Sequence, residues 1–201
     1  MYKLPYFQED NPEIVQKYSF VLLIGFDEVY PVATHVPLDI KVKNDKIIFT
    51  GHMMKNTDHH KAFEKNENVL VIFNGPNCYV SAQWYTKQNV ASTWNYIDVH
   101  AKGKISFTDE PTTKNIIEHL TGKYERSQSA SAFKNLPPEY VDRLVKAIIG
   151  FTIEVESIDN VFKLSQNHNE ADRQSIIHNL RNMSDDDSKA IAEEMEKRIT
   201  L

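Results

Sequence analysis

The sequence predicts an α+β fold that is mainly β, a closed or nearly closed barrel of six or seven short strands with helices inserted late in the chain. Three patterns favour it. Residues 20–26 form a continuous apolar run, as in a strand covered on both faces. Residues 32–42 alternate between apolar and polar side chains, the period of a half-buried strand. From Pro111 onward, apolar residues recur at helical spacing.

The totals describe an ordinary globular protein. The chain has 201 residues, 41% of them hydrophobic, which suits one domain with a helical appendage or two very small domains. No apolar stretch is long enough to cross a membrane, and the N-terminus lacks the pattern of a signal peptide. Cys78 is the only cysteine, which excludes an internal disulfide and favours a buried, inert thiol. We therefore expect a cytoplasmic protein without membrane contact.

The first half of the chain is expected to carry most of the strands. Asn11 and Pro12 predict the start of a helix that ends at Lys17. Because Pro37 cannot donate a backbone hydrogen bond, the strand over 32–42 should be an edge strand or bulged there. The remaining expected elements follow in order: a turn at 44–45, a strand over 47–50, a helix around 58–64, a strand over 69–73, a turn at 74–77, a strand over 78–82 and a long strand over 93–107.

The second half is expected to be mainly helical. One helix should run from Pro111 to Gly122, and another should begin at Pro138 after a polar loop over 125–135. Residues 151–155 alternate and return the chain to the sheet. One or two helices should follow over 170–201, the last one capped by Ser184 together with Asp187. We expect a barrel domain over 1–165 with a helical insertion at about 110–149, and a helical tail over 166–201 packed on the barrel.

A strand, a turn that opens at Gly51 and the start of a helix make the first candidate site. Free backbone N–H groups and the positive end of a helix dipole favour a phosphate at such a place. Lys55 would add a positive charge, and Asn56 and Thr57 would add hydrogen bonds. In the simpler alternative, Thr57 or Asp58 caps the helix and Lys55 is a solvated surface residue.

The second candidate site is aromatic: it spans residues 75–85, with Tyr79, Trp84 and Tyr85, and continues to residues 93–96. In the strand over 93–107 the odd positions from Ile97 onward are apolar, so Trp94 and Tyr96, together with Asp98 and His100, should lie on the opposite face. Such rings can hold a planar ligand such as a flavin. A packed aromatic cluster or a subunit interface explains them as well.

The third candidate is the segment 163–167. Its Ser165, Gln166 or Asn167 can cap a helix, and Gln and Asn side chains can also contact the polar edge of a flavin. The histidines show no metal-binding spacing, so we expect no metal. The net charge of −5 and the scattered basic residues argue against DNA binding by a single chain, although a dimer can assemble a basic patch.

Taken together, these segments resemble the PaiB-like FMN-binding family, whose members are described as negative transcriptional regulators. The resemblance rests on an ordered set of short matches over most of the chain: MYKLPYF at 1–7, ATHVPL at 33–38, TGHM at 50–53, Gly75-Pro76 through Tyr79-Val80-Ser81, Trp84-Tyr85, TWNY at 93–96 with Val99-His100-Ala101, and KLSQN at 163–167 before Asp172-Arg173. The family pattern has an arginine near Lys55; a lysine keeps the charge without the two-pronged phosphate contact.

The resemblance implies an FMN-binding split β-barrel that forms a homodimer with flavin at the subunit boundary. Met53, Met54, Lys55 and Asn56 would hold the phosphate, with Thr50 and His52 beside them. Ala33, Thr34, His35 and Val36 would line the flavin ring, and Gln166 would meet its polar edge. Trp94, Asn95 and Tyr96 would approach from the neighbouring subunit.

Three functions remain open at this stage. The first is an FMN-binding regulator of transcription, acting directly or through a partner. The second is a flavin-dependent oxidoreductase, a flavin reductase or a pyridoxamine-phosphate-oxidase-like enzyme, that uses NAD(P)H or another small-molecule substrate. The third is a haem or small-molecule binding protein on the same barrel. The sequence identifies no catalytic residue, so whether the protein is an enzyme stays open.

Overall fold

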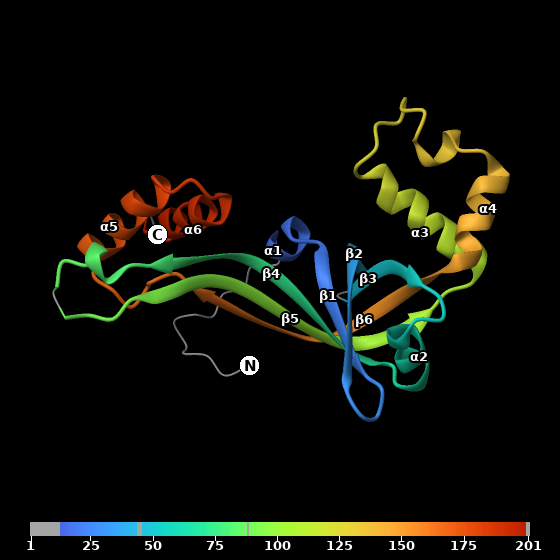
Figure 1. Cartoon of the computed structure of the whole chain (residues 1–201), viewed down its shortest axis with the longest axis horizontal. Coiled ribbons are helices and arrows are strands. Elements are labelled where there is room, and N and C mark those ends of the chain that lie inside the picture. The colour runs from blue at the N-terminus through green and yellow to red at the C-terminus, as the bar shows by residue number, and fades with distance from the viewer. Residues whose placement is uncertain (1–12, 44–45, 88, 200–201) are drawn as a thin grey trace. The chain divides into compact units, whose positions relative to one another are not determined.

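The computed structural model describes residues 13–43, 46–87 and 89–199 (Figure 1). The described residues form two compact units. The N-terminal unit contains residues 13–73 and 100–158, and the C-terminal unit contains residues 74–99 and 159–199. Among the described helices, none is both long and apolar enough to cross a membrane.

Six strands form a closed barrel in the order β1-β2-β3-β6-β5-β4, which confirms the mainly β prediction. Their bounds are β1 Phe20–Phe26, β2 Pro31–Lys43, β3 Lys46–Met54, β4 Asn68–Val80, β5 Thr93–Phe107 and β6 Ile148–Lys163. The bounds of β5 are the predicted ones. By contrast, β3 and β6 extend well beyond the short runs expected at 47–50 and 151–155.

Pro37 marks a change of partner within β2. The register pairs residues 31–37 of β2 with β1, and residues 38–43 with β3. The N–H of Leu38, the first donor after the proline, bonds the carbonyl of Ser19 at 2.8 Å. Since proline has no N–H to donate, it suits the point where one ladder ends and the next begins. The predicted irregularity at Pro37 is therefore an exchange of partners.

β4 corrects one prediction, because residues 74–77 form no turn but continue a single strand from Asn68 to Val80. Pro76 is buried, and Gly75 lies against β5, where an added Cβ would come within 2.7 Å of the Ile97 carbonyl oxygen. Glycine is needed where one backbone packs closely on another, just as it is needed in many turns. Glycine and proline at residues 75–76 predict a turn, but the packing of Gly75 on β5 explains the glycine in a continuous strand.

The described residues also form six helices: α1 Glu13–Lys17, α2 Asp58–Lys65, α3 Glu110–Gly122, α4 Pro138–Ala147, α5 Glu170–Arg181 and α6 Asp186–Lys197. The short 3-10 turns are η2 Ala82–Trp84 and η3 Phe133–Asn135, the latter inside the expected loop. The predicted N-cap at Asn11 lies outside the described residues. The predicted cap of the last helix is wrong, because Asp185 is the N-cap and its side chain accepts from the Ser188 N–H at 2.7 Å.

Each unit has its own core. In the N-terminal unit, Phe49 and Phe73 meet edge to face at 5.3 Å in the barrel interior. In the C-terminal unit, Ile176 and Leu180 of α5 and Ile191 of α6 are fully buried. These side chains are buried where α5 packs on α6. Cys78 is also buried, as predicted.

Candidate functional site

The last five residues of β3 alternate between the barrel interior and its outer surface. Gly51 and Met53 are buried, whereas Thr50 and His52 are half-buried and Met54 is exposed. Gly51 leaves no room for a side chain, because an added Cβ would lie 2.6 Å from a phenyl ring of β6. Three of the predicted ligand residues therefore share one outer row, and the Met53 side chain belongs to the core.

Backbone N–H groups of the turn after β3 already donate hydrogen bonds within the protein. The N–H of Lys55 donates to the Ala147 carbonyl at 3.0 Å, and that of Asn56 donates to Nδ1 of His60 at 3.2 Å. Thr57 is the N-cap of α2 and accepts from the His60 N–H at 3.3 Å, which confirms the capping interpretation. The half-exposed Lys55 and the exposed Asn56 side chains are left for a ligand. A phosphate here would be held by side chains rather than by a cradle of backbone N–H groups.

The two adjacent histidines of α2 have structural partners. His60 is buried, and its ring meets Phe107 edge to face at 4.8 Å. His59 lies 3.1 Å from the Asp58 carboxylate. The hydrogen bond from the His59 backbone N–H lowers the pKa of Asp58, so this carboxylate is ionised at the start of the helix. Within the described residues, no three His, Cys, Asp or Glu side chains are placed to hold a metal ion.

The His52 side chain has a polar atom without a hydrogen-bond partner among the described residues. Its Nδ1 is buried and, within the described part of the chain, has no hydrogen-bond partner. Burial lowers the pKa of the imidazole, so the ring is neutral at physiological pH. A buried polar atom without a partner costs free energy, so His52 is an unfavourable position in the outer row of β3.

The first half of β2 presents a second set of predicted residues. Ala33 and His35 are exposed, Thr34 is half-buried and Val36 is buried, so only the backbone of Val36 can meet a ligand. The exposed ring of Phe20 on β1 stacks on His35, with centroids 5.6 Å apart and planes at 21°. Phe20 was not predicted as a site residue, since only the β1–β2 register brings it beside His35.

In the C-terminal unit, the predicted aromatic face of β5 is outside the fold. Trp94 is 53% exposed and Tyr96 is 36% exposed, while Ile97 behind them is buried. Tyr79 of β4, which is also exposed, meets Trp94 edge to face at 5.9 Å. These three rings, Tyr79, Trp94 and Tyr96, are called the aromatic face below. Tyr79 belongs to the segment 75–85 of the second candidate site, and only the pairing of the strands brings its ring to Trp94.

Asn95 and Gln166 do not share that exposure. Asn95 is fully buried, where its Nδ2 donates to Met195 Sδ at 3.6 Å and its Oδ1 accepts from Ser165 Oγ at 3.1 Å. The Gln166 side chain accepts from the Leu164 N–H at 2.7 Å and donates to a nearby carbonyl. Neither Ser165, Gln166 nor Asn167 caps α5, whose N-cap is Asn169. The segment 163–167 is thus tied to β5 by its own hydrogen bonds.

Comparison with known proteins places the chain among flavin-binding relatives. Residues 1–157 match the model of the family described as "Putative FMN-binding domain". The chain is 36% identical over 204 residues to the protease synthase and sporulation protein PAI 2 of Bacillus subtilis, covering 99% of this chain and 98% of that protein. It is 31% identical to an uncharacterised protein of Emericella nidulans, over 85% of this chain and 84% of the other.

Solved structures share the fold at low identity. A conserved hypothetical protein of Mycobacterium tuberculosis superposes with a TM-score of 0.55 at 12% identity, over 85% of this chain and 96% of the other. The flavocytochrome Anf3 of Azotobacter vinelandii also gives a TM-score of 0.55 at 12% identity, over 82% of this chain and 73% of the other. The predicted split barrel with added helices is confirmed by these similarities, which concern the fold alone.

Proposed function

The chain belongs to the FMN-binding family that its residues 1–157 match, and on that premise we propose that it is a homodimeric, FMN-binding regulatory protein. FMN, the predicted cofactor, is the cofactor of this family. The subunit arrangement, the contacts to the flavin and the regulatory role are the proposal.

The aromatic face is the observation on which the proposal depends. Two strands place three large rings on the outside of the chain, and the ring of Trp94 is the most exposed of the three. Exposed apolar surface of this kind is usually covered by a ligand or by another subunit. If a flavin ring is bound between two copies of the chain, the flavin and the second copy together cover this aromatic surface. We therefore assign Trp94 and Tyr96 to the flavin bound mainly by the second copy.

The N-terminal unit supplies the other part of the proposed site. Lys55 and Asn56 would hold the phosphate by their side chains, with the half-buried His52 beside them on β3. Ala33 and His35, the exposed residues of β2, would lie along the ring. Asn95 and Gln166 would support the site through the hydrogen bonds that fix the end of β5, without touching the flavin.

The proposed regulatory role is supported by one relative. The protein of Bacillus subtilis carries the words protease synthase and sporulation in its name. Bound FMN would supply redox and spectral sensitivity. With a net charge of −5 and no concentrated basic run, the chain is poorly suited to hold DNA alone. We propose that it acts through a partner or through a dimer whose combined surface is basic.

The test is a titration of purified protein with FMN, followed by visible absorption and by light scattering on a size-exclusion column. We expect a bound flavin spectrum with one FMN per chain and the mass of a dimer. Trp94→Ala should weaken FMN binding and shift the protein toward monomer. Tyr124→Ala, which removes another highly exposed ring, should change neither.

Other results would contradict the proposal. A monomer that does not bind FMN would refute both the dimer and the site. Unchanged FMN binding by Trp94→Ala would remove the aromatic face from the site. Rapid, repeated reduction of bound FMN by NAD(P)H would favour the oxidoreductase over the regulator.

A further inference from the structure

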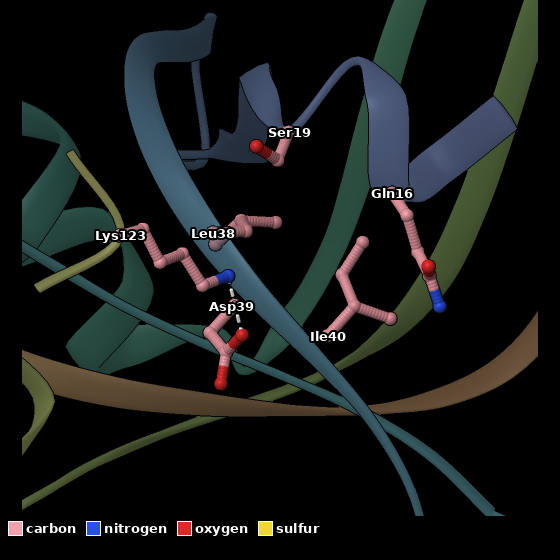
Figure 2. Close-up of a pocket in the computed structure, with 6 residues that line it drawn as sticks. All are labelled: Gln16, Ser19, Leu38, Asp39, Ile40 and Lys123. Atoms are coloured by element: carbon pink, nitrogen blue, oxygen red, sulfur yellow. Dashed lines mark ion pairs between the residues drawn. The ribbon is translucent and has the colours of Figure 1, made fainter. Parts of the chain in front are cut away.

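A cavity of about 320 Å³ lies in the N-terminal unit, apart from every residue assigned above to FMN (Figure 2). Such a volume falls at the lower end of the range for small-molecule sites. Its walls come from α1 and the residue before β1, from the second half of β2 and from the residue after α3. The lining residues are Gln16, Ser19, Leu38, Asp39, Ile40 and Lys123.

Asp39 is the buried charge of this cavity. Only 8% of its side chain is exposed, and Lys123 Nζ lies 2.5 Å from its Oδ1. Its Oδ2 lies 3.1 Å from His119 Nε2 and 3.4 Å from Lys41 Nζ. Burial opposes the charge, but the hydrogen bond and charge of Lys123, followed by the charges of His119 and Lys41, lower the pKa of Asp39 below its ordinary value. The carboxylate is therefore ionised at neutral pH.

The charges around Asp39 do not balance. Asp39 and Lys123 are the charged residues of the lining, and their charges cancel; Lys41, outside the lining, lies 3.4 Å from the same carboxylate and gives the cluster a surplus positive charge. A cationic ligand would meet a carboxylate that is already neutralised. An anionic ligand would meet the surplus charge. The sign of the cluster therefore favours an anion.

Hydrogen-bond donors border the same cavity. Within the described part of the chain, the hydroxyl of Ser19 and the amide of Gln16 make no hydrogen bond with another side chain. The Ser19 carbonyl accepts the Leu38 N–H at 2.8 Å, which fixes this wall against β2. Figure 2 shows Lys123 reaching to Asp39 on β2, with Leu38 and Ile40 as the apolar part of the lining.

We propose that this cavity binds a small organic anion, a carboxylate or a phosphate monoester. Lys123, Ser19 and Gln16 would hold its oxyanion group, because each has a donor at the cavity. Its carbon skeleton would lie against Leu38 and Ile40. Asp39 would lie beside Lys123 without touching the anion.

The proposal is independent of the flavin site, and its test is arranged to stay so. Isotope-labelled protein is first saturated with FMN and then titrated with inorganic phosphate or, separately, with succinate, while backbone amide signals are recorded by NMR. We expect saturable shifts centred on Ser19, Ile40 and Lys123. The probe that binds tighter identifies the kind of oxyanion. Shifts that do not saturate, or that spread evenly over exposed lysines, would overturn the proposal.

Asp39→Asn tests the proposal through an expected gain, rather than a loss, of phosphate affinity. Removing the negative charge of Asp39 beside an anion in a cavity that opens to water should tighten phosphate binding about fivefold. The same variant should melt at a lower temperature, because it loses the ion pairs that join β2 to α3. Asp142→Asn removes the same charge from an exposed pair with Lys114 at 3.1 Å and should leave phosphate affinity unchanged. Weaker or unchanged phosphate binding by Asp39→Asn would contradict the proposal.

A double variant keeps the test decisive if Asp39→Asn does not fold. Gln16→Ala combined with Ser19→Ala removes two donors that have no side-chain partner in the described structure. Loss of hydrogen bonds to a charged group should weaken phosphate binding at least roughly tenfold. Wild-type affinity in the double variant would show that the anion does not lie in this cavity.

Discussion

Replacing Lys55 with alanine removes the cation proposed for the FMN phosphate. In the described structure, the Lys55 ammonium takes part in no ion pair or hydrogen bond, so the substitution should leave the fold intact. A hydrogen bond to a charged group contributes about 1.5–3 kcal/mol. Because Lys55 is half-exposed and water screens its charge, we expect the lower end, about 1.5 kcal/mol, or roughly a tenfold rise in the Kd for FMN.

The assay compares FMN with riboflavin, which has the same ring and no phosphate, by the quenching of flavin fluorescence. Lys55→Ala should weaken FMN about tenfold and leave riboflavin affinity unchanged. Lys65→Ala removes an exposed lysine from the other end of α2 and should affect neither flavin. An equal loss for both flavins would show that Lys55 acts on the ring or on the shape of the site. An unchanged Kd for FMN would refute the phosphate assignment.

Three further predictions concern the rest of the chain. Gly103→Ala would place a Cβ 2.3 Å from the backbone oxygen of Glu154, so urea unfolding should show a loss of about 3 kcal/mol in the free energy of unfolding. In the control Gly122→Ala, the added Cβ meets nothing within 4 Å, and stability should be unchanged or slightly higher. Equal effects of the two substitutions would contradict the packing argument. Burial, followed by the charge of a nearby aspartate, raises the pKa of Cys78 to about 12, so iodoacetamide should alkylate it at neutral pH only after unfolding, as mass spectrometry would show. The pKa of Asp39 is lower in the folded than in the unfolded protein, so the stabilisation by its carboxylate is present at neutral pH and is lost as the pH falls below about 4. In thermal melts, Asp39→Asn should therefore lose less stability on acidification than the wild type. Parallel curves of melting temperature against pH would contradict this.

The alternation of β5 shows how far the sequence could predict the candidate site. The period of two correctly placed Trp94 and Tyr96 outside and Ile97 inside, because a strand has no other way to present alternate residues. The same period puts Asn95 in the buried row, yet it was expected to touch flavin. Its partner Met195 lies 100 residues further along, so no local pattern reveals the hydrogen bond that buries it.

Long-range partners also explain what the sequence could not predict elsewhere. Gly75 and Pro76 have the composition of a turn, but the contact of Gly75 with Ile97 keeps them in a strand. Asp39 reads as a solvent-facing residue of an alternating strand, and only the packing of α3 against β2 buries it beside Lys123. Helix bounds set by proline and glycine, such as the ends of α3, were predicted well because their signals are local.

The partner exchange at Pro37 divides β2 into two hydrogen-bonded segments in series. Residues 38–43 join β3 and help to close the barrel, whereas residues 31–37 are held by β1. A sequence change in one segment need not shift the register of the other. Evolution can therefore vary the exposed stretch around Ala33 and His35, which we propose faces the flavin, while the register between β2 and β3 stays fixed, and a single imino acid provides that separation.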